Sequence, residues 1–384
     1  MTSAADDVVA AGWPGQVAVA GFADGHAHLL EVAAGVPAPW QETTVAAFHR
    51  EIARAGRTPM DVAQPPPPAR QEEIAARLRT GLAQAAAAGL VEVTEMGMRA
   101  WWYLEALALL LRYGPLPARV RIYLASGLAE QSSWPELDDR RAAAGPWASL
   151  DGVKFYADGW LVPRTCAMCR PFADQGGDGL LFLDAATLAR RIEPFAARGW
   201  RIATHAIGDR AIATVLDAYE LAWGGDAAAL AAASPRIEHA SVQSGELTAR
   251  IAETGVTVCL QPSFAVTDAG DTRPALGPDR AAAAYPWRAL AGSGARLLAG
   301  SDYPIEVIEP LVGLARLVNG RCDRARFRHT RPAPAGSRLD AATALRLMSD
   351  AAAGETYLSA DPRTVPAGHI DWIEVRGTSP RPFA

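Results

Sequence analysis

The sequence contains almost no lysine. One of its 37 basic residues is a lysine, Lys154, and all the others are arginines. Alanine-rich segments accompany this bias, and both are typical of a genome that favours GC-rich codons. Arginine can replace lysine in surface ion pairs, but its guanidinium keeps its proton at any ordinary pH. A lysine retained in such a sequence therefore indicates a position that needs an amine able to lose its proton.

Cysteine, long apolar runs and a surplus of basic charge are also lacking. Four cysteines in 384 residues are too few for a disulfide framework, and reduced thiols in a cytoplasm are expected. No run of 18 apolar residues predicts a membrane span, and no basic region followed by an apolar stretch predicts a secretory signal. The net charge of −5 offers no basic face for nucleic acid. We expect a cytoplasmic protein that binds a small-molecule substrate, without nucleic-acid or membrane partners; a homodimer is compatible with this expectation.

Half of the residues are hydrophobic, enough for a large core, and they follow a repeating pattern. Short apolar or β-branched runs alternate with longer amphipathic or alanine-rich runs, which are typical of helices. Strands are predicted at 17–22, 91–94, 119–124, 152–156, 200–204, 236–238, 256–260 and 295–299. Strands that alternate with helices indicate parallel βαβ units. About eight such units predict an α/β fold, a (β/α)₈ TIM barrel over residues 1–366.

Three stretches depart from this pattern. Residues 31–69 include the run Pro65–Pro68 and are predicted to form a long loop over the barrel mouth. Residues 158–180 follow the fourth predicted strand directly, and loops after strands lie at the catalytic face of such barrels. Residues 367–375 are predicted to form one more strand, so that residues 367–384 make a C-terminal strand and tail.

Histidines collect where the predicted strands end. His26 and His28 are two residues apart, so that in an extended strand both side chains project to the same side. His205, His239 and Asp302 end three other predicted strands. Each of these residues alone is more often a polar cap than a metal ligand. Together, four of the seven histidines and one aspartate fall at the rim where barrels carry out their chemistry, which predicts a metal site there.

Lys154 lies within the otherwise apolar strand Val153-Lys154-Phe155. A charged ammonium at such a position costs several kcal/mol (order of magnitude) unless it is paired or neutralised. A neutral amine can instead add CO₂ and form a carbamate, whose two oxygens can bridge two cations. The alternative is an ion pair with Glu95 or Asp158. The retention of a single lysine favours the carbamate.

These motifs resemble the amidohydrolase superfamily, specifically amidohydrolase family 3, the YtcJ-like branch that includes N-substituted formamide deformylase. The matching segments, in the family's order, are GFADGHAH (21–28), GVKFYADG (152–159), THAIGDRA (204–211), RIEHA (236–240), QP (261–262), LGPDR (276–280) and GSDYP (300–304). The resemblance implies a barrel with its metal ligands on named strands. His26 and His28 would lie on the first strand, Lys154 on the fourth, His205 and His239 on the fifth and sixth, and Asp302 on the eighth.

The sequence also departs from the resemblance. Members of this branch usually carry a β-sandwich built from both termini and an inserted domain after the first motif. Here residues 31–69 stand where the insertion would be, as an insertion remnant, and residues 367–384 are similar to a remnant of the sandwich. The metal chemistry is expected to be retained, whereas substrate contacts made by the insertion cannot be.

The expected function is metal-dependent hydrolysis of a C–N bond in an amide, N-formyl compound or cyclic amide. Two zinc ions, with iron or manganese as alternatives, would be bridged by carbamylated Lys154 and by a water whose pKa they lower. Asp302 would bind one ion, take the proton as the hydroxide attacks, and pass it to the leaving nitrogen. A mononuclear site of the histidines and Asp302 is an alternative. Two other functions stay open: a deaminase or cyclic-ring hydrolase or cyclase that acts on a heterocycle, and a non-catalytic metal-binding barrel.

Candidate substrate contacts lie near the predicted ligands. Trp160 and Arg164 follow the strand of Lys154, and Tyr303 and Glu306 follow Asp302. Glu238 precedes His239, so in a strand its side chain would point away from that ring. We expect Glu238 to form a structural ion pair.

Overall fold

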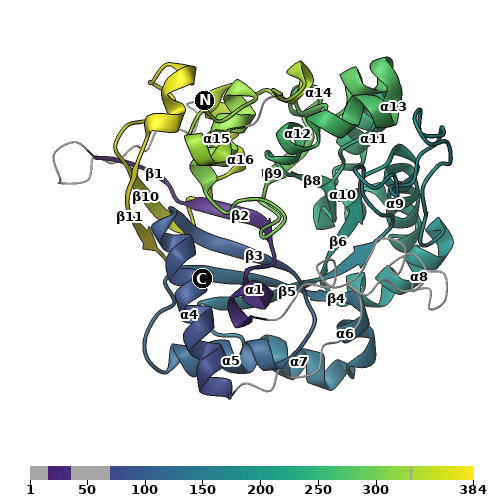
Figure 1. Ribbon diagram of the computed structural model, residues 1–384. Coiled ribbons are helices and arrows are strands. Elements are labelled where there is room, and N and C mark those ends of the chain that lie inside the picture. Colours follow the sequence, from purple (N-terminus) through teal and green to yellow (C-terminus); the bar gives the residue numbers. More distant parts are fainter. Residues whose placement is uncertain (1–15, 36–69, 329–330) are drawn as a thin grey trace.

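The computed structural model describes residues 16–35, 70–328 and 331–384. Eight parallel strands follow one another in a single sheet (Figure 1): β2 (Phe22–Ala27), β3 (Leu90–Met98), β4 (Arg119–Ala125), β5 (Ala148–Tyr156), β6 (Arg201–Ala206), β7 (Arg236–His239), β8 (Thr257–Leu260) and β9 (Arg296–Ala299). The first and last strands meet through hydrogen bonds just beyond β9. The Asp302 amide donates to the His26 carbonyl, and the His28 amide donates to the Tyr303 carbonyl, both at 2.7 Å. The predicted α/β architecture, a (β/α)₈ barrel, is confirmed.

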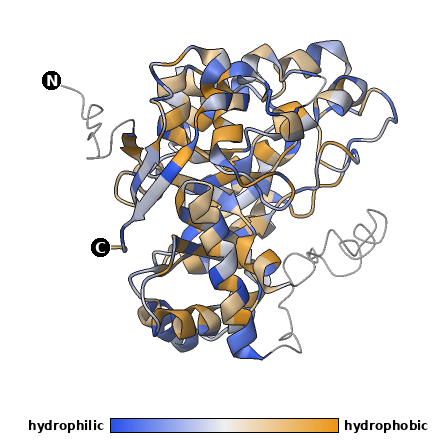
Figure 2. Ribbon diagram, turned by 60° about the vertical axis from the view of Figure 1, so that its left-hand side comes forward, coloured by the Kyte–Doolittle hydropathy of each residue, from blue (hydrophilic) through white to orange (hydrophobic). Residues whose placement is uncertain are grey.

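Helices surround the barrel and cover its outer face. They are α1 (Leu29–Ala34), α4 (Gln71–Ala87), α5 (Trp102–Leu111), α6 (Ser126–Gln131), α7 (Trp134–Ala143), α8 (Ala185–Ala196), α9 (Asp209–Ala222), α10 (Ala227–Ala233), α11 (Gly245–Thr254), α12 (Phe264–Thr267), α13 (Ala269–Ala283), α14 (Trp287–Gly292), α15 (Pro310–Asn319) and α16 (Ala341–Leu347). Figure 2 shows apolar and polar residues mixed along the helical ribbons. In α9, for example, Ile212, Val215, Leu216 and Tyr219 are buried at helical spacing against the sheet. Within the described residues, no helix has the length and apolarity needed to cross a membrane.

The interior of the barrel is filled in layers. Successive residues of a strand face opposite sides of the sheet, so every second side chain points inward. Met96, Tyr123 and Ala203 form a small apolar cluster that is separate from the main core. Lys154 and His205 lie further toward the carboxyl ends of their strands. The interior is therefore packed toward the amino ends of the strands and opens into a cavity at their carboxyl ends.

A second, smaller sheet flanks the barrel (Figure 1). It pairs β1 (Val17–Ala20), β10 (Gly354–Leu358) and β11 (Val375–Pro380) antiparallel, in the order β1-β10-β11. The predicted strand at 17–22 is therefore wrong as one unit: it divides at Gly21 between two sheets. A Cβ on Gly21 would lie 2.2 Å from Val91 Cγ2, so only glycine fits where the chain passes from one sheet to the other.

Two other predictions need correction. Residues 367–375 were expected to form a strand, but Ala367–Trp372 form a 3₁₀ helix, η4, and the strand begins only at Val375. Shorter 3₁₀ turns, η2 (Ala325–Phe327) and η3 (Ala335–Ser337), precede it. The loop expected at 31–69 is wrong for its first four residues, which belong to α1. Residues 36–69 lie outside the described part of the chain. The boundary between residues 366 and 367 stays a prediction.

Candidate metal centre

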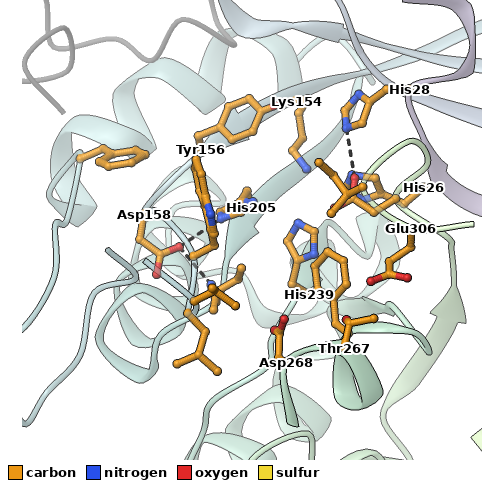
Figure 3. A pocket seen from close by; sticks show the side chains of 18 residues that line it. His26, His28, Lys154, Tyr156, Asp158, His205, His239, Thr267, Asp268 and Glu306 are labelled. Atoms are coloured by element: carbon orange, nitrogen blue, oxygen red, sulfur yellow. Dashed lines mark hydrogen bonds and ion pairs between the residues drawn. The ribbon is translucent and has the colours of Figure 1, made fainter. Parts of the chain in front are cut away.

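The carboxyl ends of the barrel strands bring the six predicted ligands together. His26 belongs to β2, Lys154 to β5, His205 to β6 and His239 to β7, while His28 and Asp302 follow β2 and β9. All six are buried, and all line one cavity of about 400 Å³. Figure 3 shows the Lys154 amine and the imidazole rings facing the same space. Ring centroids are 5.4 Å apart for His26 and His28, 5.0 Å for His26 and His239, and 4.5 Å for His205 and His239.

Asp302 lies directly against the first two histidines. Its Oδ1 is 3.3 Å from His26 Nε2 and 3.2 Å from His28 Nε2. Burial alone would raise the pKa of Asp302, but the neighbouring His26 and His28 outweigh it and hold the pKa well below its usual value. The backbone φ is +60° at Asp302 and +77° at His239. Such strained conformations persist where the surroundings fix them, and they cluster at functional sites.

His26 is oriented by a buried carboxylate. Its Nδ1 donates to Glu238 Oε2 at 2.6 Å, and Glu238 Oε1 accepts from Arg236 Nε at 2.8 Å. Because a carboxylate accepts, Nδ1 of His26 carries a proton, and Nε2 is the ring nitrogen that faces Asp302. The ion pair expected for Glu238 is present, with Arg236 as its partner. The contact with His26 was not predicted, since the two residues lie far apart in the sequence.

His205 is fixed in the opposite tautomer. Its Nε2 donates to the carbonyl oxygen of Gly159 at 2.8 Å, which leaves the lone pair on Nδ1. Burial, with the nearby Lys154 charge, lowers the pKa of His205 to about 3, and burial also lowers the pKa of His239 and of His28. These three rings are therefore neutral, which is the form that binds a metal ion.

The Lys154 amine has no hydrogen-bond partner in the described residues, although its side chain is fully buried. Burial lowers the pKa of Lys154 to about 8, with Glu238 and Asp302 opposing the shift. The alternative of an ion pair with Glu95 or Asp158 is wrong. Glu95 accepts from the Leu30 amide at 2.8 Å, and Asp158 accepts from three backbone amides, those of Ala167, Ile207 and Gly208.

The donor set fits a divalent cation. Ligand atoms of His26, His239 and Asp302 lie within 4.8 Å of one another, and His239 Nδ1 is buried with no hydrogen-bond partner in residues 16–35, 70–328 and 331–384. Neutral imidazoles with a carboxylate suit zinc, iron or manganese. A second group, His26, Glu238 and Cys259, meets the same distance. It is the poorer candidate, because Glu238 is paired with Arg236 and burial raises the pKa of the Cys259 thiol.

The predicted substrate contacts divide into two pairs. Trp160 and Glu306 line the cavity, whereas Arg164 and Tyr303 do not. The Arg164 guanidinium is held outside it by Asp174 at 2.7 Å and Asp271 at 2.9 Å. The Tyr303 carbonyl accepts from the His28 amide, so this residue closes the barrel and does not face the cavity. Sequence reasoning missed further residues that line the cavity from a strand end, from loops and from the short helix α12: Tyr156, Phe182, Ile207, Phe264, Thr267 and Asp268.

Comparisons with known proteins point to one family. A model of the amidohydrolase family matches residues 52–360, more than half of the chain. The chain is 28% identical over 267 residues to "Putative amidohydrolase YtcJ" of Bacillus subtilis (strain 168), which covers 64% of this chain and 48% of that protein. It is 30% identical over 192 residues to "Protein LONG AFTER FAR-RED 3" of Arabidopsis thaliana, which covers 47% of this chain and 32% of that protein. The matches therefore span less than half the length of these curated relatives.

Solved structures with the same fold agree. An uncharacterised metal-dependent hydrolase of Pyrococcus horikoshii OT3 superposes with a TM-score of 0.68 and 20% identity, over 92% of this chain and 88% of that chain. Another, of Pyrococcus furiosus, gives a TM-score of 0.60 and 24% identity, over 92% and 67%. At these identities the likeness shows the fold. From the family match and the order of its motifs, the chain belongs to the amidohydrolase family, in the YtcJ-like family 3.

Proposed function

We propose that this protein is a metal-dependent hydrolase that cleaves a C–N bond of a small molecule, an amide, N-formyl compound or cyclic amide. The observation that carries the proposal is the convergence of four imidazoles, the Asp302 carboxylate and the unpartnered Lys154 amine on one buried cavity. Buried polar groups normally have partners. Within the described residues, the Lys154 amine and His239 Nδ1 have none. A bound divalent cation would provide a partner for His239 Nδ1 and for a carbamate on Lys154. The family and the barrel support the hydrolase class.

The proposed ligands are His26, His28, His205, His239, Asp302 and Lys154, and the proposed cofactors are two zinc ions, with iron or manganese as alternatives. When bound, a divalent cation polarises the scissile carbonyl and makes water at the site more acidic. The Glu238 carboxylate orients the His26 ring, and the Gly159 carbonyl oxygen orients the His205 ring. These contacts fix the rings before a substrate arrives, which lowers the cost of reorganisation during the reaction.

Lys154 is proposed to carry a carbamate. The neutral amine adds to the carbon of CO₂ and loses one proton, which leaves a group with one negative charge and two oxygens. A pKa of about 8 gives an appreciable neutral fraction at pH 7.5. The modification would replace an unpartnered buried cation by an anion that faces neutral imidazoles and bound cations.

Asp302 is the proposed proton carrier. Its low pKa keeps it ionised, so it can accept a proton from water as the oxygen bonds to the carbonyl carbon. When the C–N bond breaks, the same carboxyl group returns this proton to the leaving nitrogen. The products are an amine and a carboxylate.

The test is an assay of the zinc-loaded protein on a panel of N-formyl amines, acyclic amides and cyclic amides. We expect amine and carboxylate in equal amounts, and Asp302→Asn should lower kcat by about 10³-fold, as for a lost general base. Asp279→Asn is the matched control, because that exposed residue of α13 does not line the cavity. Anomalous scattering and density at Lys154 would count the metals and reveal the carbamate.

Three results would overturn parts of the proposal. Release of ammonia from heterocycles, without amide turnover, would identify a deaminase. Absence of any turnover by fully metal-loaded protein would favour a non-catalytic metal-binding barrel. A single metal ion with an unmodified Lys154 would reduce the site to a mononuclear one.

A further inference from the structure

The cavity beside the candidate metal centre has a largely apolar wall. This wall includes Trp160, Phe182, Ile207 and Phe264. The Phe264 and His239 rings are parallel, with an interplanar angle of 3° and 5.7 Å between their centroids. The wall's other apolar residues include Val162, 42% exposed, and Ile305, 46% exposed. Large apolar side chains left open beside a cavity are typical of ligand contact. The cavity therefore suits a ligand with an apolar body.

The remaining polar wall is acidic. Outside the six proposed ligands, the charged groups that line the cavity are Asp158, Asp268 and Glu306, and no arginine is among the described residues that line it. Asp158 is held by backbone amides, as described above. Glu306 is paired with Arg316 Nη1 at 3.2 Å. Figure 3 shows Asp268 and Glu306 near His239, with Asp268 on the side of that ring away from Lys154.

Among these three carboxylates, Asp268 is the one for which the described residues provide neither an ion-pair partner nor a set of backbone amides. Its Oδ2 accepts from the Tyr285 hydroxyl at 2.6 Å, and within the described chain it forms no ion pair with a cationic side chain. Burial raises the pKa of Asp268 to about 6, with Glu306 and Asp271 adding to the effect and the Tyr285 hydroxyl opposing it. Asp268 is thus a carboxylate whose negative charge is costly in the free protein, and a cation beside it would remove that cost.

Polar atoms without a partner also lie at the other end of the same cavity. The Lys154 amine and His239 Nδ1, both in buried side chains, have no hydrogen-bond partner among the described residues. The cavity therefore has two polar ends, the candidate metal centre and Asp268, with apolar residues along it. A volume of about 400 Å³ suits one small molecule that spans both ends.

We propose that the substrate is a small amide whose apolar body carries a cationic group, a protonated amine or guanidinium, and that Asp268 binds this group. The identity of the reacting bond rests on the proposed function. The preference for a cationic over a neutral ligand does not. A positive group gains a charge-assisted hydrogen bond with Asp268, whereas an anionic group meets Asp268 and Glu306 without an arginine to receive it. Asp268 is therefore a specificity-determining residue.

The test compares two ligands of the same shape, 2-phenylethylguanidinium and 2-phenylethylurea. The first is always charged, and the second is its neutral analogue. Calorimetry on the zinc-loaded protein should show the guanidinium binding about tenfold more tightly, as for a charge-assisted hydrogen bond. Asp268→Asn should remove this difference and leave the affinity for the urea unchanged. The fold should survive, because Asp268 caps the start of α13 through its backbone carbonyl, which accepts from the Asp271 and Thr272 amides at 2.9 Å.

Asp279→Asn is the matched control, because this exposed carboxylate of α13 lies outside the cavity lining, and both affinities should stay as they are. Equal affinities of the wild type for the two ligands would overturn the inference, and so would an equal loss of both in Asp268→Asn. No measurable binding of either ligand at millimolar concentration would also overturn it. These outcomes are separate from the assay above, since a protein without amide turnover can still show or lack the preference in charge.

Discussion

The two ends of the barrel differ in whether their buried charged groups form ion pairs within the protein. At the amino end, Glu92 pairs with Arg119 and Arg121, Arg119 also pairs with Asp350 at 2.8 Å, and Arg121 pairs with Asp151. At the carboxyl end, the Lys154 amine is buried and has no such partner in the part of the chain that the structure describes. The same sheet therefore holds ion pairs at one end and, at the other, a buried amine with no partner among the described residues.

The difference follows from what each end does. Paired charges at the amino end complete the interior where the strands begin, and removing one member leaves the other buried and uncompensated. At the carboxyl end, pairing within the protein would occupy the atoms that a cation needs. Stability and function are thus separated along the barrel axis, as is usual for this architecture. Substitutions at the two ends should consequently affect different measurements.

The largest effect is expected for Lys154. Lys154→Ala should lose one metal ion and lower kcat by about 1,000-fold, because several kcal/mol of charge stabilisation at the centre are removed. Lys154→Arg should rescue neither, since a guanidinium cannot form the carbamate. Metal analysis and amide turnover measure these effects. Retained turnover in Lys154→Arg would exclude the carbamate.

At the opposite end, Arg119→Met should act on stability alone. The free energy of unfolding of the metal-free protein should fall by about 3 kcal/mol, because Glu92 and Asp350 lose a buried partner. The value of kcat should stay within roughly twofold, as for a substitution away from the site. Urea denaturation provides the measurement, and Lys154→Met provides the comparison: it should cost little stability and most of the activity. The separation between the two ends would be wrong if Arg119→Met abolished turnover while folding normally.

Glu238 lies between the two ends and should affect both measurements. Glu238→Gln weakens the hold on His26 and removes the charge partner of Arg236. We expect the affinity for zinc to fall by about 10- to 100-fold, with activity recovered at high zinc concentration. The free energy of unfolding of the metal-free variant should also decrease. Titration with a metal chelator and urea denaturation measure the two effects, and unchanged zinc affinity would show that Glu238 is only structural.

The smallest effect is a pH dependence at Asp268. A carboxylate with a pKa of about 6 is ionised above this pH and loses its charge below it. The groups that face it are the Tyr285 hydroxyl, Glu306 and Asp271, with Arg316 beyond Glu306. The preference for 2-phenylethylguanidinium over the urea should therefore fall roughly tenfold between pH 8 and pH 5. The ratio cancels any change in metal occupancy, and in Asp268→Asn it should not vary with pH.

The sequence predicted the barrel and the meeting of the six residues because both depend on local patterns. Alternating strand and helix runs specify the repeat, and histidines or an aspartate at four of the predicted strand ends specify the rim. The errors occurred where local pattern and tertiary context disagree. The apolar run at 17–22 looks continuous, but a contact with Val91 requires the break at Gly21.

Contacts between distant segments could not be predicted from the sequence. Arg164 lies beside the site along the chain, yet Asp174 and Asp271 turn its guanidinium away. Glu238 was predicted to form an ion pair, but the structure was needed to identify Arg236 as its partner, and its hydrogen bond to His26 depends on the closure of the barrel. Asp268 belongs to no motif that we recognised. Its place in the cavity follows from the turn between α12 and α13, which only the folded chain shows.

The seam of the barrel crosses the candidate metal centre. The first barrel strand meets the segment beyond the last one through hydrogen bonds of His26 with Asp302 and of His28 with Tyr303. His26, His28 and Asp302 are also proposed metal ligands, so a bound ion would bridge the join between the start and the end of the cylinder. An ion held there would stabilise the closed sheet. Its binding free energy would contribute to the folding of a barrel whose first and last strands are distant in sequence.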